Sequence, residues 1–421
     1  MRATKDSGFE WIGDIPCYWK IDKLKYHLRR NEPRNPGDAV VLSLYREFGV
    51  IPKDSRDDNH NVTSEDTSKY KYVRPGDFVI NKMKAWQGSV AVSEYEGIVS
   101  PAYFVYEFTD DTIFKRYFHY LLRSCYKDEF MRLSGGIRVG QWDLPADALE
   151  NTPILIPPMD EQCRIADFLD TKCAEIDALT TDIQNQIDTL EQYKRSVITE
   201  TVTKGLNSNA EMKDSGIEWV GEIPAHWPIH PVYSYYGERK NKNRLGKEDN
   251  LLSLSYGRVI RKDINTNDGL LPESFNTYNI VEAGDIIIRP TDLQNDKRSL
   301  RTGLVKEHGI ITSAYIDLCP LKQVDSRYFH FLLHAYDVMK VFYNMGNGVR
   351  QGLNYSEFSR LVVFEPPYEE QVAMADYLET KVTEVDTIIE QKKEQMAVLD
   401  AYKRSLIFEY VTGKKEVPCN D

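Results

Sequence analysis

The sequence predicts an α+β protein made of two homologous α/β domains and two long helices that form an antiparallel coiled coil with pseudo-two-fold symmetry. Three observations lead to this prediction. The chain repeats itself, each copy begins with strand-like segments, and each copy ends in a long stretch without glycine or proline. With 421 residues the chain can bury two cores. The predicted parts are domain 1 (1–157), a first long helix (158–206), domain 2 (207–366), a second long helix (367–414) and a tail (415–421).

The duplication is visible in matching segments. Residues 5–16 read KDSGFEWIGDIP, and residues 213–224 read KDSGIEWVGEIP. The tetrapeptide RYFH occurs at 116–119 and again at 327–330. The matches keep their order and nearly constant spacing, so the two halves should share one fold. Copies of this length are duplicated domains, because solenoid repeats contain only about 20–50 residues.

The first part of each copy has the pattern of a mixed domain. Short segments rich in β-branched and aromatic residues alternate with turn signals, which is typical of strands. One segment in each copy has apolar residues at helical spacing, at 113–133 and 326–345. The expected strands are 40–44, 77–80, 90–93 and 103–108 in the first copy, and 251–254, 285–288 and 310–318 in the second.

The second part of each copy predicts one long helix, because 160–204 and 368–412 contain neither glycine nor proline. Apolar residues recur every seven positions in these stretches, as in a coiled-coil seam, at Leu169, Ile176, Ile183, Leu190, Val197, Leu378, Val385, Leu399 and Leu406.

A second seam position is expected four residues before this first one, at Ile165, Leu179 and Tyr193. Polar residues within the seam, such as Lys392, would weaken the pairing and fix its register. Lys172 and Gln186 interrupt the seam in the same way.

Connectivity sets the direction of this pair. If the helices pack along each other, the first leads away from domain 1 and the second leads back, so they must be antiparallel. Each helix would be roughly 60 Å long, and the major groove of DNA repeats every ~34 Å. The pair could therefore hold two domains against one face of a duplex, although a scaffold for two ligand or protein modules has the same architecture.

Charge and composition exclude several classes of protein. The chain has 53 Lys+Arg, 65 Asp+Glu and a formal charge of -12, which excludes a surface that is basic all over. A nucleic-acid binder must therefore concentrate its positive charge locally. No window of about 18 apolar residues and no signal-peptide core occur, so we expect a soluble, cytoplasmic protein without a membrane partner. The six cysteines lack zinc-site spacing.

The sequence predicts no catalytic residue, metal site or cofactor in this chain. Residues 365–368 superficially resemble the acidic Pro-Pro-aromatic tetrad of amino-methyltransferases, but the repeat partner 156–159 reads Ile-Pro-Pro-Met. Proline there fits the start of a helix. His330 and His334 have the i,i+4 spacing of a metal pair without an adjacent glutamate, so helix packing is the preferred interpretation.

Two pairs of loops carry candidate DNA contacts. An arginine lies among glycines after each domain helix, where it could bind guanine or phosphate through two hydrogen bonds; capping of the helix is the alternative. A second loop follows a Gly-Asp turn in each copy and differs in residues, as expected for modules that read different sequences or for ordinary loop drift. Basic segments at 28–37 and 237–247 are either phosphate contacts or solvated charge runs. The candidates are Arg138 and Arg350 first, then Lys82, Lys84, Gln87, Arg289, Arg298 and Arg301.

Three motifs together resemble the specificity subunit of type I restriction–modification enzymes. They are KDSGxEWxGxIPxxW from Lys5 and Lys213, GIVSPAY from Gly97, and PPxxEQ at the start of each long helix. The resemblance covers essentially the whole chain. It implies that each domain binds one half of a split, asymmetric DNA target, and that the long helices form the spacer.

The resemblance also implies the partners. Two methyltransferase (modification) subunits would bind the helices, and restriction subunits would join through them. Adenine N6-methylation would then use S-adenosylmethionine held by the partner, and this chain would not be catalytic. Two other classes remain open: a stand-alone binder, which needs no modification subunit, and a self-sufficient methyltransferase, which transfers methyl groups alone.

Overall fold

The computed structural model of the chain describes residues 2–37, 39–45, 49–56, 63–64, 66–136, 142–264, 274–291, 293, 300–341, 343 and 352–418. The chain divides into two units. Unit 1 comprises Met1–Ile183 and Glu394–Asp421, and unit 2 comprises Gln184–Lys393. Both long helices cross these boundaries, so each unit contains one domain and half of each helix. The α+β class is confirmed.

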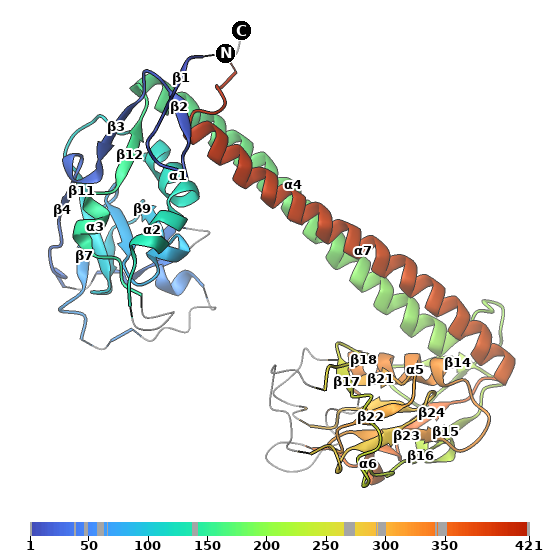
Figure 1. Cartoon of the computed structure of the whole chain (residues 1–421). Helices are drawn as coiled ribbons and strands as arrows, with labels where there is room; N and C mark the ends of the chain where they lie inside the picture. Colours follow the sequence, from blue (N-terminus) through green and yellow to red (C-terminus); the bar gives the residue numbers. More distant parts are fainter. Residues whose placement is uncertain are drawn as a thin grey trace. The chain divides into compact units, whose positions relative to one another are not determined.

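A four-stranded antiparallel sheet forms the centre of the domain in unit 1 (Figure 1). Side chains alternate between the faces of a strand, and both faces of this sheet are buried. Phe78 and Tyr106 belong to the cluster that includes Phe118 of α1 (Lys115–Cys125). Val79 and Val105 pack on the other face with residues of neighbouring strand pairs. The strand order is β4 (Leu28–Arg30), β11 (Tyr103–Phe108), β8 (Phe78–Asn81) and β9 (Val90–Val92).

The other described strands of unit 1 form two-stranded pairs. These are β1 (Thr4–Asp6) with β2 (Asp14–Pro16), β3 (Lys20–Lys23) with β12 (Pro153–Ile156), β5 (Leu42–Tyr45) with β6 (Gly49–Pro52), and β7 (Lys71–Val73) with β10 (Gly97–Val99). Short helical elements connect them: η1 (Leu24–Tyr26), η2 (Lys53–Ser55), η3 (Ala85–Gln87), α2 (Lys127–Leu133) and α3 (Ala146–Glu150).

Unit 2 repeats this topology. Its central sheet has the order β16 (Tyr236–Glu238), β23 (Ile316–Pro320), β20 (Ile286–Ile288) and β21 (Thr302–Leu304). The pairs are β13 (Met212–Asp214) with β14 (Glu222–Pro224), β15 (Ile229–Pro231) with β24 (Val362–Phe364), β17 (Leu252–Ser255) with β18 (Arg258–Arg261), and β19 (Asn279–Val281) with β22 (Gly309–Ile311). The helical elements are η4 (Val232–Ser234), α5 (Ser326–Val338) and α6 (Tyr355–Phe358).

Three predicted elements differ from the structure. The helix predicted at 113–133 is two helices, because the chain leaves helical geometry at the buried Tyr126, whose ring packs edge-on against Trp11. The helix predicted at 326–345 ends at Val338, shortly before Lys340 takes a left-handed backbone conformation. The strand predicted at 310–318 is two strands, β22 and β23, separated by a turn.

The PPxxEQ motif attaches each domain to its long helix. In unit 1 the indole nitrogen of Trp19 donates a 3.0 Å hydrogen bond to Glu161 on α4 (Met159–Lys204). In unit 2 Trp227 donates a 2.9 Å hydrogen bond to Glu370 on α7 (Tyr368–Val411). A hydrogen bond to a charged acceptor is among the stronger ones, so the glutamate of the motif holds the buried tryptophan of its own domain.

The RYFH motif attaches each domain to the end of the other long helix. In unit 1 the hydroxyl of Tyr117 donates a 3.0 Å hydrogen bond to the carbonyl of Val411, at the end of α7. In unit 2 the hydroxyl of Tyr328 lies 3.3 Å from the carbonyl of Val202, near the end of α4. Each domain is therefore joined to the beginning of one long helix and to the end of the other.

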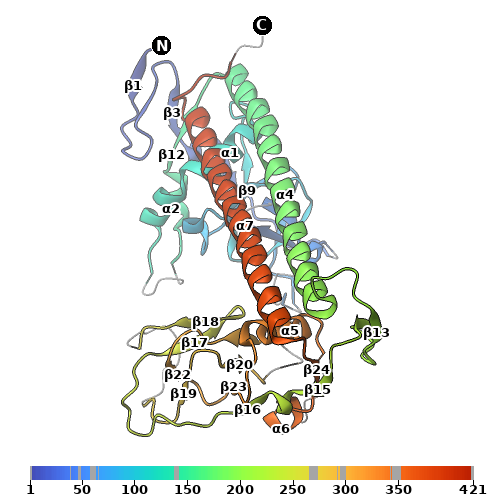
Figure 2. The same ribbon diagram turned by 90° about the vertical axis from the view of Figure 1, so that its right-hand side faces the viewer.

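The long helices run in opposite directions within each unit (Figures 1 and 2). In unit 1 Phe168 packs against Tyr410, with ring centroids 4.5 Å apart, and Lys403 binds Asp177 at 2.6 Å. Residue numbers thus rise along α4 as they fall along α7, which confirms the antiparallel direction. The corresponding pairs in unit 2 are Gln186 with Lys392 and Lys194 with Asp386.

One predicted seam position is wrong by one residue. The first position is buried or half-buried at every predicted residue, from Leu169 to Val197 and from Leu378 to Leu406. Of the three residues predicted at the second position, Ile165 is buried, but Leu179 and Tyr193 are 54% and 50% exposed. The second position lies four residues after the first, where the seam is filled by buried residues such as Cys173, Ile187, Ile389 and Tyr410.

Among the described residues, none of the helices combines the length and the apolarity needed to cross a membrane.

Candidate nucleic-acid interface

The two loops that the sequence predicts for DNA contact lie beside each other in unit 1. The backbone nitrogen of Leu144 donates a 3.0 Å hydrogen bond to the carbonyl of Lys82, and the Lys82 ammonium binds Asp143 at 2.8 Å. The rings of Trp86 and Trp142 meet edge to face, with centroids 5.6 Å apart. The loop after β8 and the loop between α2 and α3 therefore form one surface.

The predicted contact residues of unit 1 differ in accessibility. Lys84 is exposed and forms no ion pair within the described residues. Lys82 is half-buried and is paired with Asp143, and Gln87, on η3, is also half-buried. Arg138 lies outside the described residues, but Gly135 and Asp143 on either side of it pair through their backbones. Lys84 is thus the candidate whose charge is most available.

Three cations surround Phe104 on the same surface. Arg30, Lys71 and Lys82 lie 4.5, 5.4 and 5.9 Å from the centre of the Phe104 ring, distances at which cations are attracted to an aromatic face. Glu32 binds both Arg30 and Lys71, at 2.8 and 2.9 Å. We call this group, with Asp143, the Phe104 cluster; it holds three cations and two carboxylates.

Burial and hydrogen bonds change the pKa values of two groups in the Phe104 cluster. It lowers the pKa of the Lys71 ammonium, although Glu32 opposes the shift. Burial would raise the pKa of Glu32, but the hydrogen bonds from Arg30 and Lys71 outweigh it and hold this pKa below its usual value. The cluster therefore keeps a net positive charge close to a hydrophobic ring. Only Lys82 and the basic segment with Arg30 can be identified from the sequence, because Lys71 and Phe104 lie far from them along the chain and join the cluster only in the folded domain.

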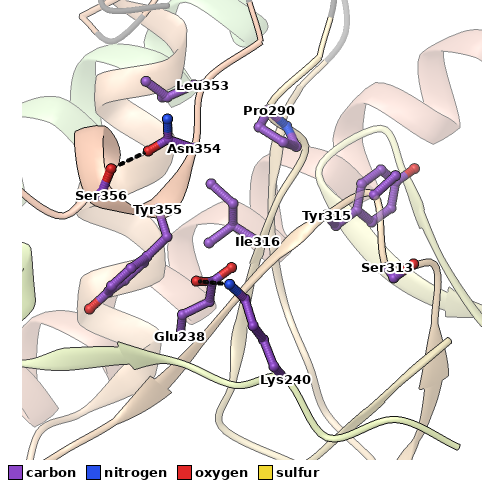
Figure 3. Close-up of a pocket in the computed structure, with 11 residues that line it drawn as sticks. Glu238, Lys240, Pro290, Ser313, Tyr315, Ile316, Leu353, Asn354, Tyr355 and Ser356 are labelled. Atoms are coloured by element: carbon purple, nitrogen blue, oxygen red, sulfur yellow. Dashed lines mark hydrogen bonds and ion pairs between the residues drawn. The ribbon is translucent and has the colours of Figure 1, made fainter. Parts of the chain in front are cut away.

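The same two loops meet in unit 2. The backbone nitrogen of Leu353 donates a 3.0 Å hydrogen bond to the carbonyl of Pro290, as Leu144 does to Lys82 in unit 1. A pocket of about 400 Å³ opens at this junction (Figure 3). Its lining is mixed, with an ion pair between Glu238 and Lys240, the aromatic ring of Tyr315, and polar side chains from the start of α6. We call it the unit 2 pocket.

Arg301, which the sequence predicts as a DNA contact, lies inside the domain in this structure, not on its surface. Its side chain is fully buried, its Nε donates a 2.9 Å hydrogen bond to the hydroxyl of Tyr343, and its guanidinium also donates to the carbonyl of Thr291. Its backbone nitrogen donates to Asp337. Arg301 therefore supports the loop from inside.

The remaining predicted contacts of unit 2 are less informative. Arg289 is half-buried, and its backbone nitrogen donates to the carbonyl of Arg301 at 2.8 Å. Arg298 and Arg350 lie outside the described residues and stay predictions. The basic segment at 237–247 is partly structural, because Arg239 holds the buried Asp285 through hydrogen bonds of 2.8 and 3.0 Å.

A second buried carboxylate lies beside this pair. Asp317 is 3.8 Å from Arg239, and among the described residues neither of its carboxylate oxygens has a hydrogen-bond partner. Burial, with the nearby Asp285 charge adding to it, raises the pKa of Asp317 to about 8.

Among the described residues, no other side chains join the histidine pair of α5 in a metal centre. Burial lowers the pKa of His330 to about 3 and that of His334 to about 4, so both are neutral near pH 7. Within the part of the chain that the structure describes, no group of three or more His, Cys, Asp or Glu side chains could hold a metal ion.

Exposed apolar side chains form a second surface on the long helices. Leu179 and Tyr193 on α4 are matched by Ile388 and Tyr402 on α7, which are 42% and 54% exposed. Unit 1 contains Leu179 and Tyr402, and unit 2 contains Tyr193 and Ile388. All four flank the seam at the same heptad position. We call these two pairs the helix stripes. Large exposed apolar patches mark protein interaction sites, so the helix stripes are candidates for such a site.

Comparison with known proteins places these features in context. The family described as "Type I restriction modification DNA specificity domain" matches residues 26–189. The type I restriction enzyme MjaVIII specificity subunit and the MjaX specificity subunit of Methanocaldococcus jannaschii are each 24% identical to the chain. Each alignment covers 99% of this chain, with 98% of MjaVIII and 99% of MjaX.

Solved structures show the same fold. A chain from a structural study of complex assembly and conformational transition of the type I R-M system superposes with a TM-score of 0.70 at 13% identity, covering 95% of this chain and 99% of that one. The HsdS subunit from Thermoanaerobacter tengcongensis gives a TM-score of 0.50 at 14% identity, covering 95% and 98%.

Proposed function

The chain belongs to the family of type I restriction–modification specificity subunits, the non-catalytic, DNA-recognising components of these enzymes, and we propose that it reads a bipartite, asymmetric DNA target. In this proposal each domain reads one half-site. The observation that carries it is the repeated junction of two loops, once with the Phe104 cluster and once with the unit 2 pocket.

Different residues at one structural position are what two unlike half-sites require. Phosphates fix the position of a protein on DNA, whereas base edges give sequence specificity. The exposed Lys84, which lies beside the net positive Phe104 cluster, suits phosphate contact. The mixed lining of the unit 2 pocket suits donors and acceptors on base edges. Arg138 and Arg350 remain the first candidates among the predicted residues, because the loops that carry them start and end beside these junctions.

The paired long helices would set the distance between the half-sites. Their antiparallel pairing in each unit supports this role. The hydrogen bonds that connect each domain to both helices support it as well. The number of unread base pairs between the half-sites would then follow from helix length.

The helix stripes support docking of two methyltransferase subunits. The stripes are equivalent by the duplication, so a partner that recognises one should also recognise the other. The partners would hold S-adenosylmethionine and methylate adenine, and restriction subunits would join through them. The complex would act in the cytoplasm, where chromosomal DNA lies.

Docking can be tested by disabling one stripe at a time. Leu179→Asp with Tyr402→Asp alters the unit 1 stripe, and Tyr193→Asp with Ile388→Asp alters the unit 2 stripe. Each double variant should retain one methyltransferase subunit per chain where the unchanged protein binds two, as measured by mass photometry of the co-expressed complex. Gln184→Asp, on the other flank of the seam of α4, is the control and should still bind two.

The same complex tests the reading function. Adenine methylation mapped in cells with and without this gene should reveal one split motif that depends on it. A chain that binds its target without any methyltransferase subunit would instead be a stand-alone binder. Methyl transfer by the purified chain alone would contradict the non-catalytic role.

A further inference from the structure

Two equivalent edge strands carry an ion pair in opposite order. In unit 1, Arg30 of β4 lies opposite Tyr106 of β11. In unit 2, Glu238 of β16 lies opposite Leu318 of β23. Tyr106 and Leu318 occupy the same place in their strands, because they pair with Phe78 and Ile286 at the same position of β8 and β20. Arg30 and Glu238 are therefore structural equivalents of opposite charge.

The reversal continues two residues later. Glu32 follows Arg30, whereas Lys240 follows Glu238. Each acid forms an ion pair with its neighbouring base: Arg30 lies 2.8 Å from Glu32, and Lys240 lies 2.8 Å from Glu238. Residues two apart on an extended chain lie on the same face, so each pair presents one acid and one base side by side.

Both pairs lie where the two predicted reading loops meet. Glu238 and Lys240 line the unit 2 pocket together with Pro290 and Leu353, which belong to the two loops (Figure 3). In unit 1 the guanidinium of Arg30 lies over Phe104, as does the ammonium of Lys82 from the first loop. The basic side chains are accessible, since those of Lys240 and Arg30 are 69% and 41% exposed, whereas those of their partners Glu238 and Glu32 are 21% and 18% exposed.

Stability does not explain the reversal. In unit 2, where Lys240 is 69% exposed, an ion pair of this kind contributes little to folding, so stability gives no reason for the order found there. Recognition of base edges does depend on the order. Arginine and lysine donate to O6 and N7 of guanine, whereas glutamate accepts from the amino group of cytosine. Reversing the pair therefore reverses the pattern of donors and acceptors without changing the net charge of the surface.

We propose that Arg30 with Glu32, and Glu238 with Lys240, are base-reading residues that give the two half-sites opposite donor and acceptor patterns at equivalent positions. When DNA binds, each ion pair breaks, and its two side chains form hydrogen bonds with base edges instead of with each other. This inference rests on the proposed function, and it identifies the residues that make the two domains read different sequences.

The test reverses the pair in unit 2. The variant Glu238→Lys with Lys240→Glu keeps the composition, the net charge and an ion pair, so the fold should be retained. The assembled complex with methyltransferase subunits, unchanged or variant, selects bound DNA from a library randomised over both half-sites. We expect the preferred base to change at one or two positions of one half-site, with discrimination on the order of tenfold to a hundredfold, while the other half-site stays the same.

A matched control comes from the same domain. Lys322 binds Glu365 at 2.9 Å, beyond the Pro320 end of β23, whereas Ile316 at the other end of β23 lines the pocket. Reversing this pair, with Lys322→Glu and Glu365→Lys, should leave the selected motif unchanged.

The outcomes separate this inference from the proposed function. An unchanged motif in the reversed variant overturns the inference alone, and so does loss of all specific binding by a variant that still assembles. If the reversed variant does not assemble, Glu238→Gln takes its place: relaxed discrimination at one position supports the inference, and unaltered discrimination overturns it. If the unchanged complex selects no motif, the proposed function falls and the inference falls with it.

Discussion

Replacing Gly413 by alanine should loosen the attachment of α7 to domain 1. Gly413 follows α7 and has a φ of +71°, a left-handed conformation that costs an L-residue about 1–2 kcal/mol. A Cβ atom there would lie 2.6 Å from the ring of Pro16 and 2.8 Å from that of Trp19. The indole of Trp19 is fully buried, so overpacking adds about 1–3 kcal/mol. We expect Gly413→Ala to lower the free energy of unfolding of unit 1 by about 2–5 kcal/mol.

Two other glycines separate strain from packing. Gly8, also in unit 1, has a φ of +76° and nothing within 4 Å of its Cβ position, so Gly8→Ala should cost only the strain. Gly205 follows α4, has a φ of +73°, and its Cβ would lie 3.2 Å from Trp227. The loss in free energy of unfolding caused by Gly205→Ala should therefore lie between those of the other two variants, and it should affect unit 2.

The assay is urea denaturation of the full chain, followed by circular dichroism and tryptophan fluorescence. Gly413→Ala and Gly8→Ala act on the same unit, so their midpoints can be compared directly. If the two variants are equally destabilised, the end of α7 is not packed against Pro16 and Trp19, and the attachment described for unit 1 is wrong.

Three further predictions address charge, spacing and contact. The raised pKa of Asp317 means that the folded chain retains a proton that the unfolded chain releases, so stability should fall as pH rises from about 4 to about 8. Asp317→Asn should remove that dependence and raise the free energy of unfolding at pH 8 by about 2 kcal/mol or more, and an unaltered pH profile of thermal unfolding would show that Asp317 is charged when folded. Deleting one heptad from each helix, 184–190 and 389–395, shortens the pair by about 10 Å and should narrow the unread gap in the methylated motif by about three base pairs; an unchanged gap would exclude the spacer role. Arg350→Ala should weaken DNA binding in a mobility-shift assay while the methyltransferase complex still assembles, and unchanged affinity would remove this loop from the interface.

The duplication and the long helices could be predicted because local sequence determines them. The absence of glycine and proline in 160–204 and 368–412 places α4 and α7 to within a residue or two at each end. The second seam position was misplaced because Leu179 and Tyr193 are apolar but exposed. Polar residues such as Lys194 take the seam position instead, with the charge satisfied by Asp386.

The candidate site was harder to predict because it depends on contacts between distant segments. The two loops of each domain were identified separately, but their junction requires the fold that brings Leu144 to Lys82. The burial of Arg301 cannot be predicted either, because nothing near it in sequence reveals Tyr343, whose hydroxyl accepts its hydrogen bond. Lys71 could not be predicted because it lies far from Phe104 in sequence and approaches its ring only in the folded domain.

Independent reading by two domains is the central claim, and exchange of one domain tests it most directly. Residues 20–157 would be replaced by the same region of a relative, and methylated adenines would be mapped by sequencing in cells that supply the methyltransferase subunit. The account predicts a motif in which one half has changed, while the other half and the gap are the same as before. A motif altered in both halves would contradict it.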